Sequence, residues 1–188
     1  EIKIDVLFVS HLTNNQQVLH DDDAYFGDLP NQLLEYNISS GIALIDHIGI
    51  NDRKISIGWL SGMVHRFVLS SNLNFLSEIK LYITQRKSKK ILKSILKNLQ
   101  VNKILAKDIL RHHLSSGTFN ALRIAKQVAG IVEKTGAKFV VITYEGYPWE
   151  RLVYFYARRI NPDIKCFGYQ HAAVFEHQYA ITRQLAKN

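Results

Sequence analysis

Cysteine is nearly absent from this chain of 188 residues, which has Cys166 as its single thiol. One thiol excludes an intrachain disulfide framework and a zinc site built on cysteine pairs. Cys166 lies in an apolar, strand-like pattern, which favours a buried packing thiol over a nucleophile. The scarcity of cysteine is typical of a reducing, cytoplasmic compartment. No apolar run approaches the roughly 20 residues that a membrane-spanning helix needs.

Several sequence motifs of catalysis and phosphate binding are also missing. No Gly-x-Gly-x-x-Gly loop, Walker loop or Gly-x-Ser-x-Gly elbow follows an apolar run. His112 and His113 are adjacent, so on a helix they point in different directions and make a poor metal pair. The triplet Asp21-Asp22-Asp23 either binds a divalent cation or forms a solvated loop.

Acidic residues are missing from one long stretch of a chain whose formal net charge is +8. Between Ile79 and Lys107 there is no Asp or Glu, whereas basic residues are frequent. Such a surface suits phosphates, an anionic lipid surface or an anionic glycan, and the alternative is an ordinary solvated helix face. Nucleic acid is not expected, because no aromatic–basic recognition motif accompanies the basic residues. The residues predicted to bind an anionic surface are Lys87, Lys89, Lys90 and Lys93.

The first third of the chain predicts a β-α-β unit. Apolar, β-branched runs at 3–10 and 41–50 are typical of buried strands. Between them, Asp28 is placed to cap a helix that begins near Pro30, where proline is tolerated. Residues 55–76 are ambiguous: they fit a short strand at 66–70, preceded by a loop or a short helix.

The middle of the chain predicts helices. Over 77–98, aliphatic residues recur at intervals of four with lysines between them, which indicates a basic amphipathic helix. This helix either lies on a membrane or in a partner's groove, or packs its aliphatic face on its own core. Two further helices are predicted at 102–114 and 119–135, the second closed by Gly136.

The last third predicts a second β-α-β unit. A strand at 138–144 is followed by a tight turn, a helix at 148–160 and a strand at 164–169. Together the patterns predict an α/β fold with a Rossmann-like, mostly parallel sheet flanked by helices. We expect one such domain over 1–188, as half of a longer two-domain protein.

Polar residues follow four of the predicted strands. In open parallel sheets, ligands bind outside the carboxyl ends of the strands. The segments at these ends are Ser10-His11, Asp46-His47, Glu145-Gly146 and Gln170-His171.

Glu145 and His171 are the candidate catalytic residues. Partial burial would raise the pKa of the Glu145 carboxyl toward that of a general base, while the following helix start would favour its ionised form. The alternative role of Glu145 is to cap the helix that Pro148 begins. His171 could donate to a phosphate or act as an acid or base, although a lone histidine is more often structural.

Four segments, taken in order, suggest a family: VLFVSHLT, YFGDLP, TYEGYPWERL and GYQHAAVF. Together they resemble bacterial surface-carbohydrate biosynthesis proteins, namely glycosyltransferases of the two-domain GT-B type from capsule and lipopolysaccharide pathways, of the Kdo-transferase kind. The resemblance touches both ends of the chain, whereas residues 50–130 carry little of it.

The resemblance implies that this chain is the N-terminal, acceptor-binding half of such an enzyme. The acceptor would be a surface polysaccharide or a lipid-linked glycan at the inner face of the bacterial inner membrane. The nucleotide-sugar donor, with a CMP-linked sugar as one candidate, would bind the other half, and no metal or tightly bound cofactor is implied. By position, the substrate-binding residues would be His11, Asp28, Gly146 and Gln170.

Two other functions stay open at this stage. The first is a non-catalytic Rossmann-like module that binds an anionic partner through its basic helical face. The second is a stand-alone hydrolase or epimerase acting on nucleotide sugars.

Overall fold

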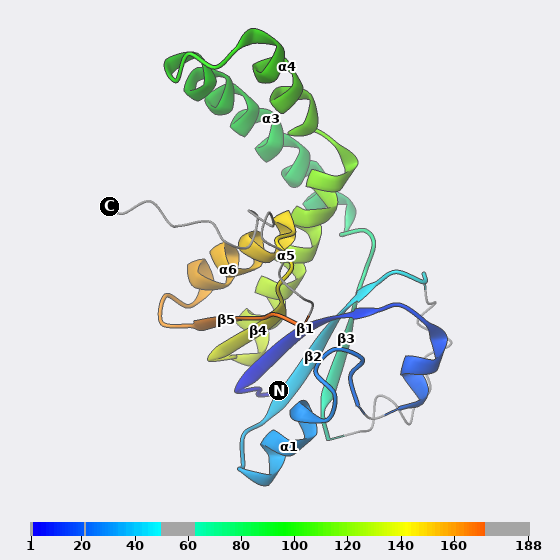
Figure 1. Cartoon of the computed structure of the whole chain (residues 1–188). Coiled ribbons are helices and arrows are strands. Elements are labelled where there is room, and N and C mark those ends of the chain that lie inside the picture. The colour runs from blue at the N-terminus through cyan, green and yellow to red at the C-terminus, as the bar shows by residue number, and fades with distance from the viewer. Residues whose placement is uncertain (1, 21, 50–62, 172–188) are drawn as a thin grey trace. The chain divides into compact units, whose positions relative to one another are not determined.

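The computed structural model describes residues 2–20, 22–49 and 63–171 (Figure 1). The predicted loop or short helix before Met63 and the segment that follows His171 lie outside the described residues. The elements, in chain order, are β1 (Val6–Leu12), the 3-10 turn η1 (Asn15–Leu19), α1 (Leu29–Glu35), β2 (Ser40–Asp46), β3 (His65–Leu69), α3 (Phe75–Asn98), α4 (Lys103–His112), α5 (Ser116–Thr135), β4 (Phe139–Thr143), α6 (Pro148–Ile160) and β5 (Lys165–Tyr169).

The five described strands form one parallel sheet in the order β3-β2-β1-β4-β5. The central strand β1 pairs with β2 from Val6 opposite Ser40 onward, and with β4 from Val6 opposite Phe139. This order is that of a Rossmann-like sheet, and the predicted α/β fold class is confirmed. The direction of strand succession reverses between β1 and β4, which is where ligands bind in such sheets.

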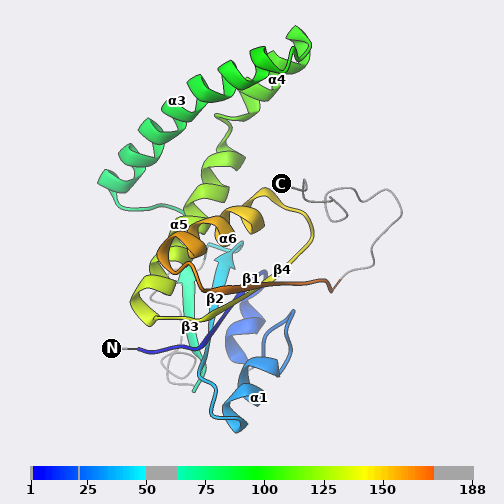
Figure 2. The same cartoon turned by 90° about the vertical axis from the view of Figure 1, so that its left-hand side faces the viewer.

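Both faces of β1 are buried, because helices cover both sides of the sheet. Figure 2 shows α1 on one side and α5 and α6 on the other. Alternate residues of β1, such as Phe8 and Leu12, pack in the core cluster on the α1 side, which includes Phe26. Leu7 and Val9, which lie on either side of Phe8 in the chain, are fully buried too. They point to the opposite face, because side chains alternate along a strand.

The chain divides into two compact units, and the boundary falls within α5. Unit 1 contains the sheet, from the amino terminus to Ser70 and again from Ile124 onward. Unit 2, Ser71–Arg123, contains α3, α4 and the first part of α5. Within unit 2, Arg123 donates two hydrogen bonds to the Glu78 carboxylate, at 2.6 and 2.8 Å. The sequence pattern predicted these helices but not that they form a unit of their own.

Most predicted elements are confirmed within two or three residues. The helix predicted at 148–160 has those bounds, and the strand predicted at 66–70 is β3. The strand predicted at 41–50 ends earlier, because the Asp46 side chain accepts hydrogen bonds from the N–H groups of Ile48 and Gly49, both at 2.9 Å. This turn leaves His47 directly after the carboxyl end of β2. No helix in the described part of the chain is both long and apolar enough to cross a membrane.

Gly41 in β2 has no space for a side chain. A Cβ atom there would lie 2.5 Å from Ile4 Cδ1 and 3.2 Å from the carbonyl oxygen of His65. We therefore expect Gly41→Ala to destabilise the protein by about 1–3 kcal/mol, measured by urea unfolding. The matched control is Gly130→Ala in α5, where a Cβ would meet nothing within 4 Å and should stabilise the helix by up to about 1 kcal/mol. Equal stability of Gly41→Ala and the unmodified protein would contradict this view of the sheet.

Candidate functional site at the strand ends

Side chains from four neighbouring strands meet at the carboxyl edge of the sheet. His11 belongs to β1 and Thr143 to β4, and these two strands flank the point where strand order reverses. The other members follow β2, β4 and β5 or come from the loop after β1. We call this group the strand-end cluster; its members are His11, Tyr25, His47, Thr143, Glu145 and His171.

His11 connects three strands. Its Nδ1 lies 2.8 Å from His47 Nε2, and its Nε2 lies 3.1 Å from Thr143 Oγ1. Burial, followed by electrostatic repulsion from the neighbouring His47 and His171 rings, lowers the pKa of His11 from 6.5 to about 4. At neutral pH the His11 ring is therefore uncharged, with one nitrogen donating and the other accepting.

Glu145 and His171 form a pair. Glu145 Oε1 lies 3.0 Å from His171 Nε2, and the two side chains are 30% and 24% exposed. A neutral imidazole that donates from Nε2 to a carboxylate carries its lone pair on Nδ1. The pair thus combines an oriented histidine with a carboxylate that stabilises its protonated form, and both groups are accessible to solvent. This is the arrangement of a general base and its orienting acid.

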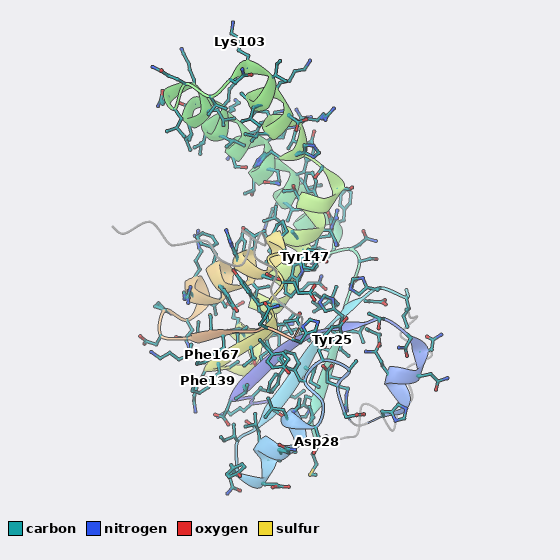
Figure 3. The ribbon with its side chains drawn as sticks, in the orientation of Figure 1. Tyr25, Asp28, Lys103, Phe139, Tyr147 and Phe167 are labelled. Carbon is teal, nitrogen blue, oxygen red and sulfur yellow. The ribbon has the colours of Figure 1, made fainter. Side chains whose placement is uncertain are left out.

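Aromatic rings surround the two histidines. The Tyr25 ring contacts His171 edge to face at 4.8 Å and lies 5.3 Å from His11. The Trp149 ring lies 5.7 Å from His11, and the Tyr169 ring is stacked 6.4 Å from His171. Burial and the nearby Glu145 and Asp23 charges raise the pKa of Tyr25, so its hydroxyl stays protonated. Figure 3 shows Tyr25 near the carboxyl ends of the strands.

The loop that carries Tyr25 is held by a buried carboxylate. Asp23 Oδ1 accepts hydrogen bonds from Ser10 Oγ at 2.8 Å and from the N–H groups of Tyr25 and Phe26 at 2.9 and 3.0 Å. Asp23, the last residue of the aspartate triplet, therefore uses its Oδ1 to hold the loop. Asp21, the first residue of the triplet, lies outside the described residues. Within 2–20, 22–49 and 63–171, no three His, Cys, Asp or Glu side chains are grouped to hold a metal ion.

A second buried carboxylate, Glu150, shapes the turn that carries Glu145. Its Oε1 and Oε2 accept hydrogen bonds from the N–H groups of Glu145 and Gly146, both at 2.8 Å. Burial raises the pKa of Glu150, while these N–H groups oppose that rise. Capping of α6 was the alternative role predicted for Glu145, but the start of α6 has no side-chain cap, and Glu150 holds the turn that precedes it.

Gly146 and Gln170 adjoin the pair. Gly146 has a φ of +93°, a conformation that glycine adopts at low cost, and its N–H reaches Glu150. Gln170 is half-buried between Tyr169 and His171. Sequence reasoning named both residues but missed Tyr25 and Thr143, because their roles depend on contacts between distant segments. It also missed Glu150, whose partners are the nearby N–H groups of Glu145 and Gly146.

Asp28 does not cap α1, which corrects its predicted role at the start of that helix, whereas its place in the cleft stays a prediction. Its carboxylate accepts a hydrogen bond from Asn31 Nδ2 at 2.8 Å and makes no cap to the backbone of α1. The adjoining Pro30 carbonyl accepts a hydrogen bond from Ser40, the first residue of β2. The first turn of α1 therefore lies beside the amino end of β2.

The other predicted residues lie elsewhere. The four lysines predicted to bind an anionic surface are all on α3, in unit 2. Cys166 in β5 is half-buried, and burial raises the pKa of its thiol, which keeps it protonated. This agrees with the predicted packing role of Cys166.

Comparisons with known proteins give no family for this chain. No protein-family model matches it, and no curated protein matches its sequence. Among solved structures, the C-terminal domain of a hydrogenase from Pyrococcus furiosus is similar over 92% of this chain and 93% of that one, with 11% identity and a TM-score of 0.42. A likeness of this size carries no argument about function.

Replacing Glu150 should change the turn that carries Glu145 while leaving the side chains of Glu145 and His171 in place in the sequence. Glu150→Ala removes the acceptor of two backbone N–H groups, so we expect a destabilisation of about 2–4 kcal/mol in urea unfolding. We also expect a change in the NMR shifts of the His171 ring, because the turn presenting Glu145 loses its anchor. Glu133→Ala, an exposed position on α5, should change stability by less than about 0.5 kcal/mol. Unchanged stability in Glu150→Ala would refute this role.

The lowered pKa of His11 predicts a loss of stability in acid. Because the folded pKa of about 4 lies below the ordinary value of 6.5, the unfolded chain takes up a proton that the folded chain rejects. The contribution is fully present above pH 6.5 and is lost progressively as the pH falls to about 4. In His11→Asn, urea midpoints measured at pH 7, 5.5 and 4 should fall less steeply than in the unmodified protein. Parallel curves would show that His11 does not titrate in this way.

Proposed function

We propose that the strand-end cluster binds the hydroxyl-bearing acceptor of a glycosyltransferase, and that this chain is the acceptor-binding half of such an enzyme. The observation that carries the proposal is the Glu145–His171 pair, 3.0 Å apart and partly exposed. The pair lies at the carboxyl ends of β4 and β5, next to the reversal of strand order where Rossmann-like sheets bind ligands.

The chemistry of the pair suits the activation of a sugar hydroxyl. His171 Nδ1 would take the proton of the acceptor hydroxyl as its oxygen attacks the anomeric carbon of the donor sugar, while the bond from that carbon to the nucleotide phosphate breaks. Glu145 would hold the imidazole in position and stabilise its positive charge. Catalysis by such a base contributes about 10²–10⁴-fold to the rate.

The walls of the cluster suit a sugar as well. Tyr25 and Tyr169 present partly exposed aromatic rings beside His171, and aromatic rings pack against the apolar faces of small ligands. The uncharged His11 uses both ring nitrogens within the protein, one toward His47 and one toward Thr143, and so fixes the strand ends behind the pair.

The remaining parts of the proposal rest on the sequence resemblance. The acceptor is a bacterial surface polysaccharide or a lipid-linked glycan of capsule or lipopolysaccharide synthesis. The nucleotide-sugar donor binds a second half of the polypeptide, and a CMP-linked sugar is one candidate donor. The enzyme acts in the cytoplasm, at the inner face of the bacterial inner membrane.

The test measures both binding and transfer. In the chain itself, lipopolysaccharide core and capsule oligosaccharides should shift the NMR signals of the His171 and His11 rings. In the longer polypeptide, Glu145→Ala and His171→Ala should lower kcat for sugar transfer by at least about 100-fold. The matched controls are Glu133→Ala on α5 and His65→Ala at the amino end of β3, which should transfer at normal rates. Normal rates in both Glu145→Ala and His171→Ala would remove the pair from the mechanism.

A second function is favoured by the exposed lysines of α3, namely a non-catalytic module that binds an anionic partner through this helix. Reversing the charges of Lys87, Lys89, Lys90 and Lys93 would then abolish binding of the partner, while Glu145→Ala would change nothing. The opposite pattern, loss of transfer only in Glu145→Ala, supports the glycosyltransferase.

A further inference from the structure

Unit 2 exposes apolar side chains where α3 ends and α4 begins. These two helices pack together as a hairpin (Figures 1 and 2). We call this end of unit 2 the hairpin tip. Its exposed apolar residues are Ile91 (63% exposed), Ile95 (46%), Leu99 (69%), Ile104 (81%) and Leu105 (55%).

The folding of unit 2 does not explain this surface. The buried residues of α3 are Leu81, Gln85 and Leu96, whereas Ile91, Ile95 and Leu99 recur at intervals of four along another stripe. No residue of α4 is buried. Exposed clusters of large aliphatic side chains are uncommon and mark interaction surfaces.

The charges of the tip are of one sign. In the sequence, Lys93, Lys97, Lys103 and Lys107 are interleaved with the apolar residues, and there is no acidic residue from Ile79 to Lys107. Figure 3 shows Lys103 extending outward from the start of α4. The tip therefore offers two different attractions, one for an apolar phase and one for negative charge.

This combination fits a lipid surface better than a protein or a nucleic acid. Protein interfaces are depleted in lysine, whereas interfacial membrane helices combine exposed leucine or isoleucine with many lysines. Nucleic-acid binding uses the basic residues but leaves the aliphatic ones in water. Lysine stems can lie along apolar surface while their ammonium groups reach phosphates, so neighbouring lysine and isoleucine residues do not conflict in a bilayer interface.

We propose that the hairpin tip docks on an anionic lipid bilayer. Leu99, Ile104 and their apolar neighbours enter the boundary between headgroups and acyl chains, and the four lysines contact lipid phosphates. The proposal deepens the peripheral-membrane part of the proposed function, but it stands on residues of unit 2 alone. The proposed contact also differs from the one predicted from the sequence. Of the four lysines predicted to bind an anionic surface, only Lys93 belongs to the tip.

The first experiment tests the charges with the full chain of 188 residues. Sedimentation with vesicles of phosphatidylcholine and phosphatidylglycerol at 70:30 should pull down the protein, and pure phosphatidylcholine vesicles should not. Each lysine near an anionic surface contributes roughly five-fold to binding. Reversal of Lys93, Lys97 and Lys103 to Glu should therefore weaken binding by more than about 100-fold. The matched control reverses Lys3, Lys134 and Lys165, which are exposed in unit 1, and should bind within a few-fold of the unmodified chain.

The second experiment tests the apolar residues. Leu99→Ser with Ile104→Ser should weaken vesicle binding by at least about 10-fold, because two exposed side chains lose their contact with the acyl boundary. The matched control is Leu76→Ser with Phe75→Ser, which are equally exposed, at 69% and 78%, but lie at the other end of α3. Circular dichroism should show equal helix content in all variants, since every changed residue is exposed.

Three results would overturn the proposal. The first is equal binding to neutral and anionic vesicles, and the second is equal weakening in tip and control variants. The third is an absence of vesicle binding together with a dimer in solution, or a complex with nucleic acid, that the tip variants abolish. Because the readout is lipid binding, Glu145→Ala and His171→Ala should leave it unchanged, so failure here and failure of the proposed reaction are distinguishable.

Discussion

The pairing of β1 with β2 on one side and β4 on the other determines the rest of unit 1. This central position buries β1 on both faces and makes its carboxyl end the point where strand order reverses. His11 consequently lies between a residue that follows β2 and a residue of β4. A one-residue slip of β1 would turn His11 to the opposite face of the sheet and separate it from His47 and Thr143. The strand-end cluster therefore depends on backbone register before it depends on any side chain.

Two buried carboxylates complete the site by shaping loops. Asp23 closes the loop that carries Tyr25, and Glu150 closes the turn that carries Glu145. Both accept hydrogen bonds from backbone N–H groups, which compensate for burial of the charge. Since Glu150 performs this structural role, the Glu145 side chain points to His171 and stays partly exposed. Glu150 is thus the buried, structural carboxylate, and Glu145 is the partly exposed carboxylate that pairs with a histidine.

The two units differ in how far their large apolar side chains are exposed to water. In unit 1 the large aliphatic side chains of β1 and β2 are buried, as in other parallel sheets. In unit 2 the hairpin tip leaves isoleucines and leucines in water beside lysines. Exposed apolar area is costly for a soluble surface, and net positive charge there adds self-repulsion. An anionic lipid surface would reduce both costs, whereas the aromatic rings and the Glu145–His171 pair of the strand-end cluster suit a different ligand.

The sequence by itself determined the elements and the fold class, because burial periodicity and turn residues are local signals. It also pointed to His11, Glu145 and His171, since the ends of parallel strands share one edge of the sheet. Only the tertiary structure decided which of these side chains touch. It paired Glu145 with His171, made Glu150 the acceptor for the turn before α6, left α1 without a cap from Asp28 and divided the chain within α5. These outcomes depend on strand register and on contacts between residues far apart in the chain, which no local pattern encodes.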